Sequence, residues 1–551
     1  MKKRMYALWI LTLFVIVLTG CEIQTPSQEF IQNSVNDEIT NTILSQDSLK
    51  IPYPRLAMWW LNAYEATATE MARYDLLLNE FDDPYLFDKL EEIRRLNPSQ
   101  ILLRPISPSE HQIYSYGSES IPNPAIAKLP TSFFLVHQGA HLIEAIDENT
   151  KWIKVDRILD ETGNPLFYVG DDIAIGDYES AKIEGIDLNT MTLEVMRGHI
   201  REASAHNASE NVQAHVRFWP NSWVMNITSA CPELMVQGVD YPVDYISYFH
   251  LLIQNKVDGL YKYKTENPYF IYQGKVQYDG FVLDRFEDHQ SWLKWVDVQP
   301  RDLDPFQNQT VVTDEDFDTL VMQTVDQFTH LLKTTYDGSI IIRNNPLTLR
   351  ADLHDGQVYE SFGWDNPSSD WWRNLFITSS KNPDQYISLS YLEWFNMKPS
   401  PIVFMEVYED ERGADSDGDG VYRNPAEDPN FEVNEKKMRF SLTSTLLGDG
   451  FYSYEINTNG HGSLGLLWFD AYDLGMGEKG YLGFPTGEAE EIEPGLFIRN
   501  FDNGIVVVNV TAHDYSPQFK NDMKPANGFK TGSAGEISAF DGCIYLFEPK
   551  K

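Results

Sequence analysis

The architecture of this chain can be read from one stretch, Tyr278-Asp279-Gly280-Phe281-Val282-Leu283-Asp284-Arg285-Phe286-Glu287-Asp288. An apolar run follows the glycine and ends at the carboxylate of Asp284, after which charged and aromatic residues take over. This pattern is typical of a buried parallel strand that emerges into solvent at its carboxyl end. Because barrel enzymes keep their catalytic groups at such strand ends, Asp284 is a candidate catalytic residue.

Similar apolar segments lie on both sides of this stretch. We expect strands at residues 55–61, 74–78, 99–104, 338–343, 356–361, 401–406 and 450–455. Amphipathic helices are expected between them, at residues 66–73, 84–96, 242–256 and 317–333. Strands that alternate with helices form a parallel sheet, so eight strands between residues 55 and 455 predict an α/β fold, a (β/α)8 TIM barrel.

Two regions depart from this rhythm. Residues 131–217 lack a helical period and contain β-type segments at 152–155, 172–175, 181–186 and 191–195, which predict a small β module inserted into the barrel. Within it we expect Arg197, Gly198 and His206 to be turn and packing residues, not a catalytic pair. Residues 481–551, with the hairpin signal Asn503-Gly504, predict a C-terminal antiparallel β domain.

The N-terminus carries an export signal. A basic start, Met1-Lys2-Lys3-Arg4, is followed by the apolar residues 7–17 and by Leu18-Thr19-Gly20-Cys21, which resembles the lipobox of bacterial lipoproteins. In that motif the chain is cleaved before the cysteine, and the cysteine is lipid-modified; an ordinary secretory leader with an incidental Cys21 is the alternative. We therefore expect a protein of the bacterial cell envelope that faces outside the cytoplasm and contacts the membrane through its lipid anchor only.

These signals predict the domain organisation. It comprises a signal peptide at 1–20, a tether at 21–50, the barrel in two parts at 51–130 and 218–480, the inserted module at 131–217 and the C-terminal domain at 481–551. The formal charge of −39 repels phosphate backbones, so nucleic acid is not an expected partner. Cys231 and Cys543 can form a disulfide in an exported protein, although two isolated buried thiols are favoured.

Four motifs carry a family resemblance. They are residues 278–284, Gly356-Gln357-Val358-Tyr359-Glu360, Tyr481-Leu482-Gly483-Phe484-Pro485 and residues 499–509. Together they resemble the hypothetical, barrel-type glycoside hydrolase-like families of bacteria, over residues 53–548. The resemblance implies a TIM-barrel glycosidase that acts on a polysaccharide or oligosaccharide.

Glycoside hydrolysis needs two carboxyl groups, one to protonate the leaving oxygen and one to act as nucleophile or to activate water. By resemblance to barrels with carboxylates on these strands, Asp284 is the expected nucleophile or base and Glu360 the expected acid. A less polar setting beside Tyr359 and Phe362 would raise the pKa of Glu360. The catalysis needs no cofactor.

Other residues near the predicted strand ends are candidates for binding sugar. Arg104, at the predicted end of the third strand, and Asn62 can hydrogen-bond hydroxyl groups, and Glu406 and Glu455 can orient substrate. Tryptophan rings stack on sugars, although core packing is the commoner role of the residue. The tryptophan candidates are Trp59, Trp60, Trp364 and Trp468.

A calcium loop is indicated by Asp415-Ser416-Asp417-Gly418-Asp419-Gly420-Val421. Asp415, Asp417 and Asp419 occupy the first, third and fifth positions of a Ca²⁺ loop, and Val421 the position that contributes a backbone carbonyl. Ala426 stands at the closing position, so the EF-hand pattern is incomplete. We expect a structural Ca²⁺ site; a solvated acidic loop is the alternative.

Phosphate-binding loops, zinc-ligand spacings and the Gly-x-Ser-x-Gly elbow do not stand out, which disfavours kinases, metalloproteases and esterases. The leading hypothesis is a lipoprotein that hydrolyses a polysaccharide. The alternatives are a glycan-binding surface lipoprotein on a catalytically silent barrel and a structural envelope protein.

Overall fold

The structure is a computed structural model, and all the residues it describes belong to the compact unit Ile43–Lys551. It describes residues 49–59, 66–79, 86–114, 120–123, 126, 128–219, 221–254, 256, 271–272, 275–276, 278–297, 299–344, 353–360, 368–378, 380–381, 387–388, 390–396, 401–409, 434–456, 468–517, 523–529 and 536–548.

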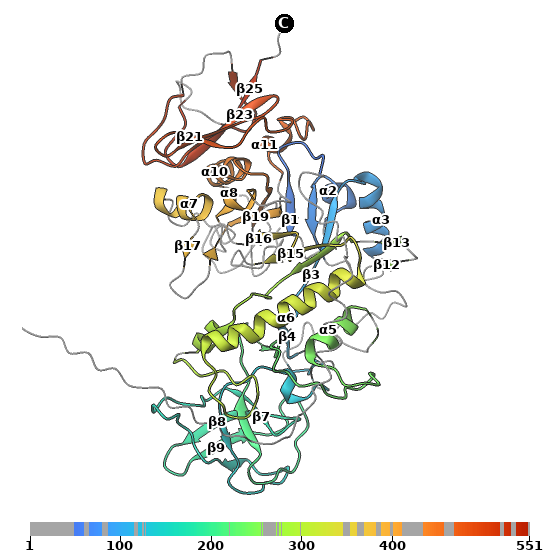
Figure 1. The fold of residues 1–551 in the computed structure, drawn as a ribbon, viewed down its shortest axis with the longest axis vertical. Coiled ribbons are helices and arrows are strands. Elements are labelled where there is room, and N and C mark those ends of the chain that lie inside the picture. Colours follow the sequence, from blue (N-terminus) through green and yellow to red (C-terminus); the bar gives the residue numbers. More distant parts are fainter. Residues whose placement is uncertain are drawn as a thin grey trace, which may run out of the picture. The chain divides into compact units, whose positions relative to one another are not determined.

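Eight parallel strands form a closed barrel (Figure 1). Each strand pairs with its neighbours in chain order, and a parallel bridge from Leu56 to Tyr452 joins the first strand to the last. At this closure the Tyr452 backbone N–H donates to the Arg55 carbonyl over 3.0 Å. The predicted (β/α)8 barrel is confirmed. The strands are β1 (Ala57–Trp59), β2 (Leu76–Leu78), β3 (Ile101–Ile106), β14 (Gly280–Leu283), β15 (Ile340–Asn344), β16 (Gly356–Tyr359), β19 (Ile402–Glu409) and β20 (Phe451–Ile456).

Side chains alternate between the two faces of each strand. One face fills the barrel interior with an apolar cluster whose buried members, apart from Ile51, all come from barrel strands. The other face packs against the helices in a larger core. The interior cluster is Ile51, Ala57, Trp59, Leu76, Leu78, Ile101, Leu103, Val282, Ile340, Ile342, Val358, Ile402, Phe404 and Phe451.

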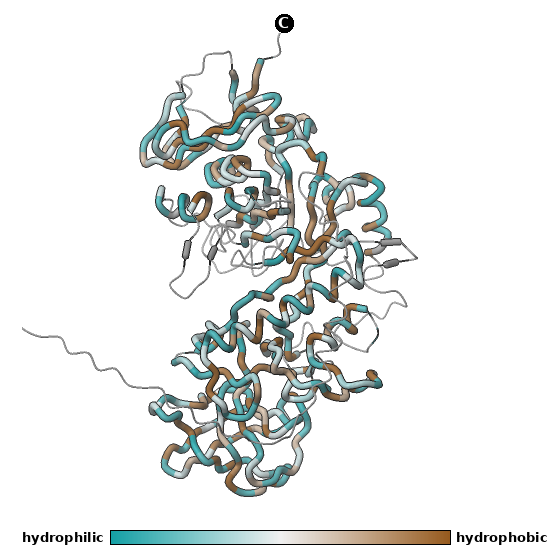
Figure 2. Tube along the Cα trace, in the orientation of Figure 1, coloured by the Kyte–Doolittle hydropathy of each residue, from teal (hydrophilic) through white to brown (hydrophobic). Residues whose placement is uncertain are grey.

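The helices surround the barrel, as the sequence periodicity predicts. The longest is α6 (Asp314–Thr335), which begins where the Thr313 hydroxyl accepts a hydrogen bond from the Asp316 backbone N–H. Its buried residues recur every three or four positions, and Figure 2 shows the resulting alternation of hydrophobic and hydrophilic segments along the helix. The others are α2 (Ala68–Met71), α3 (Phe87–Leu96), α5 (Tyr245–Ile253), α7 (Ser369–Phe376), α8 (Tyr391–Trp394), α10 (Glu435–Leu446) and α11 (Asp470–Asp473).

An aspartate stands directly before each of the strands β2, β14 and β16. Its carboxylate accepts a hydrogen bond from a backbone N–H at the start of the neighbouring barrel strand. The carboxylates of Asp75, Asp279 and Asp355 accept the backbone N–H groups of Leu56, Leu102 and Ile341 over 2.8, 2.7 and 2.7 Å. Each also pairs with a cation, which is Lys479 for Asp75, Arg94 for Asp279 and Lys333 for Asp355. These contacts set the register of each strand against its neighbour at the amino-terminal end of the barrel.

The glycines that open β14 and β16 are required by close backbone approach. A Cβ atom on Gly280 would lie 1.7 Å from the Ile340 carbonyl oxygen, and one on Gly356 would lie 1.7 Å from that of Ile402. Any side chain here would therefore push neighbouring strands apart.

The inserted module is a six-stranded antiparallel sheet with its own apolar core. Its strand order is β5 (Ala140–His141), β10 (Asn211–Ala214), β7 (Asp172–Ile175), β8 (Glu179–Asp187), β9 (Thr192–Met196) and β6 (Trp152–Lys154). The four predicted β segments are confirmed, and β5 and β10 are additional. The module lies in the chain between β4 (Glu110–Gln112) and β11 (Ser222–Val224), which pair with each other antiparallel.

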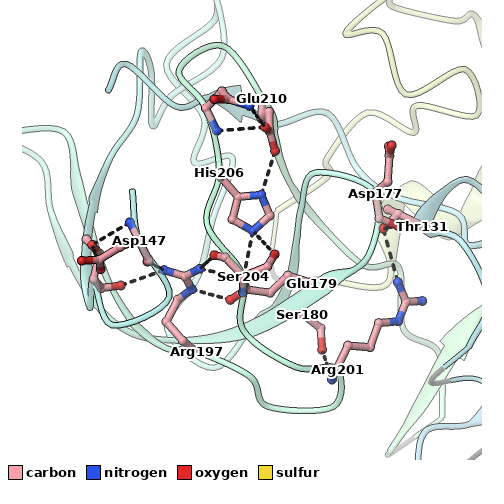
Figure 3. Close-up of polar contacts among 12 residues, drawn as sticks. Thr131, Asp147, Asp177, Glu179, Ser180, Arg197, Arg201, Ser204, His206 and Glu210 are labelled. Atoms are coloured by element: carbon pink, nitrogen blue, oxygen red, sulfur yellow. Dashed lines mark hydrogen bonds and ion pairs between the residues drawn. The ribbon is translucent and has the colours of Figure 1, made fainter. Parts of the chain in front are cut away.

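A buried ionic network holds the loop between β9 and β10 (Figure 3). Glu179 accepts hydrogen bonds from Arg197 over 2.6 Å and from the Ser204 backbone over 2.9 Å, and His206 bridges Glu179 and Glu210 over 2.8 and 2.7 Å. Burial alone would lower the pKa of His206, but its bonds to both carboxylates raise it above the ordinary value. Arg197 and His206 are thus ion-paired inside the module, and Gly198 has the positive φ expected of a turn glycine.

The C-terminal sheet is antiparallel, as predicted. Its strand order is β21 (Glu490–Glu493), β22 (Leu496–Asn500), β23 (Gly504–Asn509), β25 (Asp541–Phe547) and β24 (Met523–Pro525), and the turn at Asn503-Gly504 joins β22 to β23. An ion pair of Arg439 on α10 with Asp541, at 2.7 Å, attaches the sheet to the barrel helices. Cys231 and Cys543 are free and buried, which confirms the favoured reading. Within the described ranges, helices fall short of the length and apolarity needed to cross a membrane.

Candidate active site

Three polar residues occupy equivalent places at the carboxyl ends of neighbouring strands. Asp284 follows β14, Asn344 ends β15 and Glu360 follows β16. Two positions earlier in each strand stand Val282, Ile342 and Val358, which belong to the interior cluster. By alternation, the three polar side chains project from the interior face just beyond that apolar filling. This is the place where (β/α)8 barrels hold their catalytic groups.

The Asn344 amide connects the two carboxylates. Its Nδ2 atom donates a hydrogen bond to Asp284 Oδ1 over 2.9 Å and a second, short hydrogen bond to Glu360 Oε2. An amide nitrogen carries two hydrogens, so it can serve both acceptors at once. The structure therefore brings the two predicted catalytic residues together and adds Asn344, which the sequence pattern does not single out.

The three residues differ in exposure. Asn344 is buried, Asp284 is half-buried and Glu360 is exposed. The less polar setting expected for Glu360 is therefore wrong for this structure. The physical reason is that Glu360 lies one residue beyond the strand, above the apolar layer, while Tyr359 points to the opposite face and packs in the outer core.

The residue after Asp284 has an unusual backbone. Arg285 adopts a positive φ of 53°, a conformation that non-glycine residues hold only when their surroundings fix it. Here the guanidinium pairs with Glu287 over 2.8 Å and lies 4.0 Å from the Phe218 ring and 5.1 Å from that of Trp292. Asp284 is thus positioned by a strand on one side and by a fixed loop on the other.

Three further acids lie in this loop or next to it. Glu110 accepts hydrogen bonds from the Trp219 backbone over 2.9 Å and from the Ser222 hydroxyl, and its Oε2 atom is 3.9 Å from Arg285. Burial raises the pKa of Glu110 and of Glu287, and the charge of Asp284 raises both further. The next acid, Asp288, forms a short ion pair with Arg343, which ties this loop to β15.

Three predicted substrate contacts are buried in the barrel. Trp59 is 2% exposed and packs edge-on against Phe404 in the interior cluster, so it is a core residue and not an exposed sugar platform. Glu455 accepts hydrogen bonds from the Trp59 backbone over 3.1 Å and from the Ser453 hydroxyl over 2.9 Å, which braces the closure of β1 on β20. Glu406 lies on the interior face of β19 and is buried.

Two other predicted contacts lie away from the carboxyl pair. Arg104 is inside β3, not at its end, and alternation places it on the outer face, in register with Phe281 of the outer core. Trp468 packs against Tyr74 and lies under the Arg73 guanidinium at 3.5 Å, next to the amino-terminal end of β2. Because catalysis in barrels occurs at the opposite end, Trp468 is a packing residue.

The remaining predicted residues lie outside the described part of the chain. They are Trp60, Asn62 and Trp364 for substrate, Asp415, Asp417, Asp419 and Val421 for calcium, and Cys21 for lipid. Among the residues that are described, His, Cys, Asp and Glu side chains do not gather in groups of three or more that could hold a metal ion.

Comparison with known proteins gives likenesses of fold only. The chain matches no family model and no curated protein sequence. Solved structures with a similar chain path include the glycoside hydrolase domain of PelA from Pseudomonas aeruginosa (9% identity, TM-score 0.28, covering 75% of this chain and 97% of that one). A Family GH13_31 enzyme (8%, 0.36, 89% and 98%) and an alpha-amylase from Geobacillus thermoleovorans complexed with acarbose (10%, 0.34, 88% and 90%) are also similar. At these sequence identities and TM-scores the similarities say nothing of function, so the function of this chain has to be argued from the geometry of the site.

Proposed function

We propose that this protein is a glycoside hydrolase that cleaves a polysaccharide or oligosaccharide with Asp284 and Glu360 as its carboxyl pair. The observation that supports this function best is the Asn344 amide, which holds one oxygen of each carboxyl group at the carboxyl end of a (β/α)8 barrel. Two carboxyl groups that face one reaction centre are what glycosidic bond cleavage requires.

The spacing supports a retaining mechanism. Two oxygens that are both hydrogen-bonded to one nitrogen lie no more than ~6 Å apart. Retaining enzymes hold their carboxyl groups about 5 to 5.5 Å apart, whereas inverting enzymes need about 6.5 to 9.5 Å to admit a water molecule. In this proposal Asp284 is the nucleophile.

The two carboxyl groups take different roles in this proposal. Asp284 attacks the anomeric carbon while the glycosidic C–O bond breaks, and Glu360 gives its proton to the leaving oxygen. Because Asn344 donates to Glu360 Oε2, that proton sits on Oε1, which leaves the hydrogen bond intact. Water then attacks the glycosyl-enzyme ester, Glu360 takes a proton from it, and Asp284 is released as a carboxylate.

The proposal is tested by Asp284→Asn on a panel of polysaccharides with product analysis. Activity on the cleaved glycan should disappear while the thermal midpoint changes little; Asp187→Asn in the inserted module, half-buried like Asp284, serves as the matched control. Full activity in Asp284→Asn contradicts the assignment. Glycan binding without turnover by the wild-type protein supports instead a glycan-binding lipoprotein on a silent barrel.

We also propose, from the sequence alone, that Cys21 carries the lipid anchor and that Asp415, Asp417, Asp419 and the Val421 carbonyl bind Ca²⁺. Cys21→Ser should move the protein from the membrane fraction to the soluble one. A chelator should lower the thermal midpoint, and added Ca²⁺ should restore it. If neither the chelator nor added Ca²⁺ changes the thermal midpoint, the segment is a solvated acidic loop and not a calcium site.

A further inference from the structure

An aromatic cluster stands next to the candidate active site. Phe218 and Trp219, in the segment that returns from the inserted module to β11, meet Trp292 of the short helix η4 (Ser291–Trp295). The Phe218 ring makes edge contacts with the Trp219 ring at 5.0 Å and the Trp292 ring at 5.2 Å. Phe218 and Trp292 are half-buried, whereas Trp219 is 55% exposed. We call these three residues the Trp219 platform.

The platform is held by the residues that hold Asp284. Arg285, which follows Asp284 directly, stacks its guanidinium on Phe218 at 4.0 Å and faces Trp292 at 5.1 Å. Glu110 accepts the Trp219 backbone N–H over 2.9 Å, and the pairing of β4 with β11 fixes the chain that follows Trp219. The exposed Trp219 ring is therefore held by buried polar residues. One of them, Arg285, directly follows the proposed nucleophile Asp284 in the chain.

The mounting argues against an incidental surface tryptophan. Glu110 and Arg285 are largely buried, and burying charged groups is costly unless they are paired and hydrogen-bonded, as Arg285 is with Glu287 and Glu110 is with the Trp219 backbone. A left-handed backbone at Arg285 adds local strain. What this framework fixes is the position of a large apolar ring that then remains open to solvent, which is the property of a surface made for a ligand.

The chemistry of the cluster indicates the ligand. The apolar C–H face of a pyranose ring stacks on the electron-rich face of an aromatic ring. Arg285 is already paired with Glu287 at 2.8 Å and lies 3.9 Å from Glu110, and Asp284 adds another acid, so the cluster is negative. Like charges disfavour a uronate or sulfated sugar here.

We propose that the Trp219 platform is a sugar-binding subsite for a neutral glycan chain that extends from the cleavage point at Asp284 over the return segment of the inserted module. This inference rests on the proposed function for the location of the cleavage point. It assigns the inserted module a part in substrate recognition, because Phe218 and Trp219 belong to the segment that leaves it.

Binding can be measured without turnover in the Asp284→Asn background, by calorimetry with maltohexaose, cellohexaose, xylohexaose, chitohexaose and a hexamer of galacturonic acid. Trp219→Ala should weaken binding of the neutral hexamer that the parent binds by at least about fivefold, and Trp219→Tyr should restore most of it. The control is Trp152→Ala, which removes a tryptophan of similar exposure, 54%, from the edge strand β6 and should leave binding unchanged.

The outcomes separate this inference from the proposed function. If the wild-type protein cleaves a glycan but Trp219→Ala binds it as tightly as the parent, the subsite is wrong and the hydrolase stands. If glycans bind through Trp219 but none is cleaved, the subsite stands and the hydrolase is wrong. Preferential binding of the galacturonate hexamer, or an equal loss in Trp152→Ala, overturns the inference, as does the absence of binding to every probe.

Discussion

Asn344 and Asp284 are 60 residues apart in the chain, and a 2.9 Å hydrogen bond joins them at the carboxyl ends of adjacent strands. A donor to a carboxylate stabilises its ionised form, so this bond favours the charged state that a nucleophile needs. The same amide reaches Glu360, so a single side chain couples the two groups of the proposed reaction.

Removing that amide should damage catalysis without unfolding the barrel. Asn344→Ala should lower kcat/KM by roughly 10² to 10³, the usual cost of a lost donor to a charged catalytic group. Loss of this donor removes a hydrogen bond that favours the ionised carboxylate, so the acidic limb of the pH profile should move to higher pH. Circular dichroism should remain native, and an unchanged pH profile would refute the coupling.

The loss of Glu360 should lower the rate most for substrates whose leaving group needs a proton to depart. Glu360→Gln cannot donate a proton, so hydrolysis of a natural glycan should fall by roughly 10² to 10⁴. Aryl glycosides with acidic phenols depart without protonation and should be affected far less. Equal losses on both substrates would show that Glu360 is not the acid.

Gly280 should not tolerate a side chain. In Gly280→Ala the new Cβ would lie 1.7 Å from the Ile340 carbonyl oxygen, so the strands would separate and the free energy of unfolding should fall by about 3 kcal/mol or more. Gly487→Ala is the control, since a Cβ there would meet no atom within 4 Å. Urea denaturation measures both, and equal stability of the two variants would contradict the steric argument.

The His206 network predicts a pH-dependent stability. A histidine whose folded pKa is raised contributes stability at pH values below its unfolded pKa, near 6.5, and loses it as the pH rises through the folded value. His206→Gln should therefore be less stable than the wild type by about 2 kcal/mol at pH 6, and the gap should narrow at pH 9. Thermal melts of both proteins at pH 6 and pH 9 test this. A stability difference that does not change with pH would show that His206 is not protonated in the folded protein.

The sequence allowed the barrel and its carboxyl pair to be predicted because both depend on local patterns. Buried parallel strands are short apolar runs, and Asp284 and Glu360 each stand directly after one. Asn344 also ends such a run, but an amide side chain does not indicate acid, base or nucleophilic chemistry as a carboxylate does. Only the order of the strands, with β15 between β14 and β16, and the two hydrogen bonds of its amide show that Asn344 lies between the two acids.

The substrate residues were harder to predict because orientation is not local. Trp59 lies in a strand whose residues are all buried, so the pattern does not show which side chains face inward. Arg104 resembles a strand end because a charged residue is rare inside a buried strand, yet β3 continues to Ile106. Trp219 is distinguished by its backbone hydrogen bond to Glu110, more than a hundred residues away, and by its neighbour Phe218, on which Arg285 stacks; no local pattern reveals either contact.

The aspartates at the amino-terminal end of the barrel also stand at a fixed number of residues before the two proposed catalytic residues. Asp284 follows Asp279 by five residues, and Glu360 follows Asp355 by the same five. Because successive side chains alternate between faces, this odd count points the aspartate at the start of the strand and the proposed catalytic acid in opposite directions. One residue inserted or deleted between them would point the acid into the helix layer, so the direction of each proposed catalytic side chain is set at the far end of its strand.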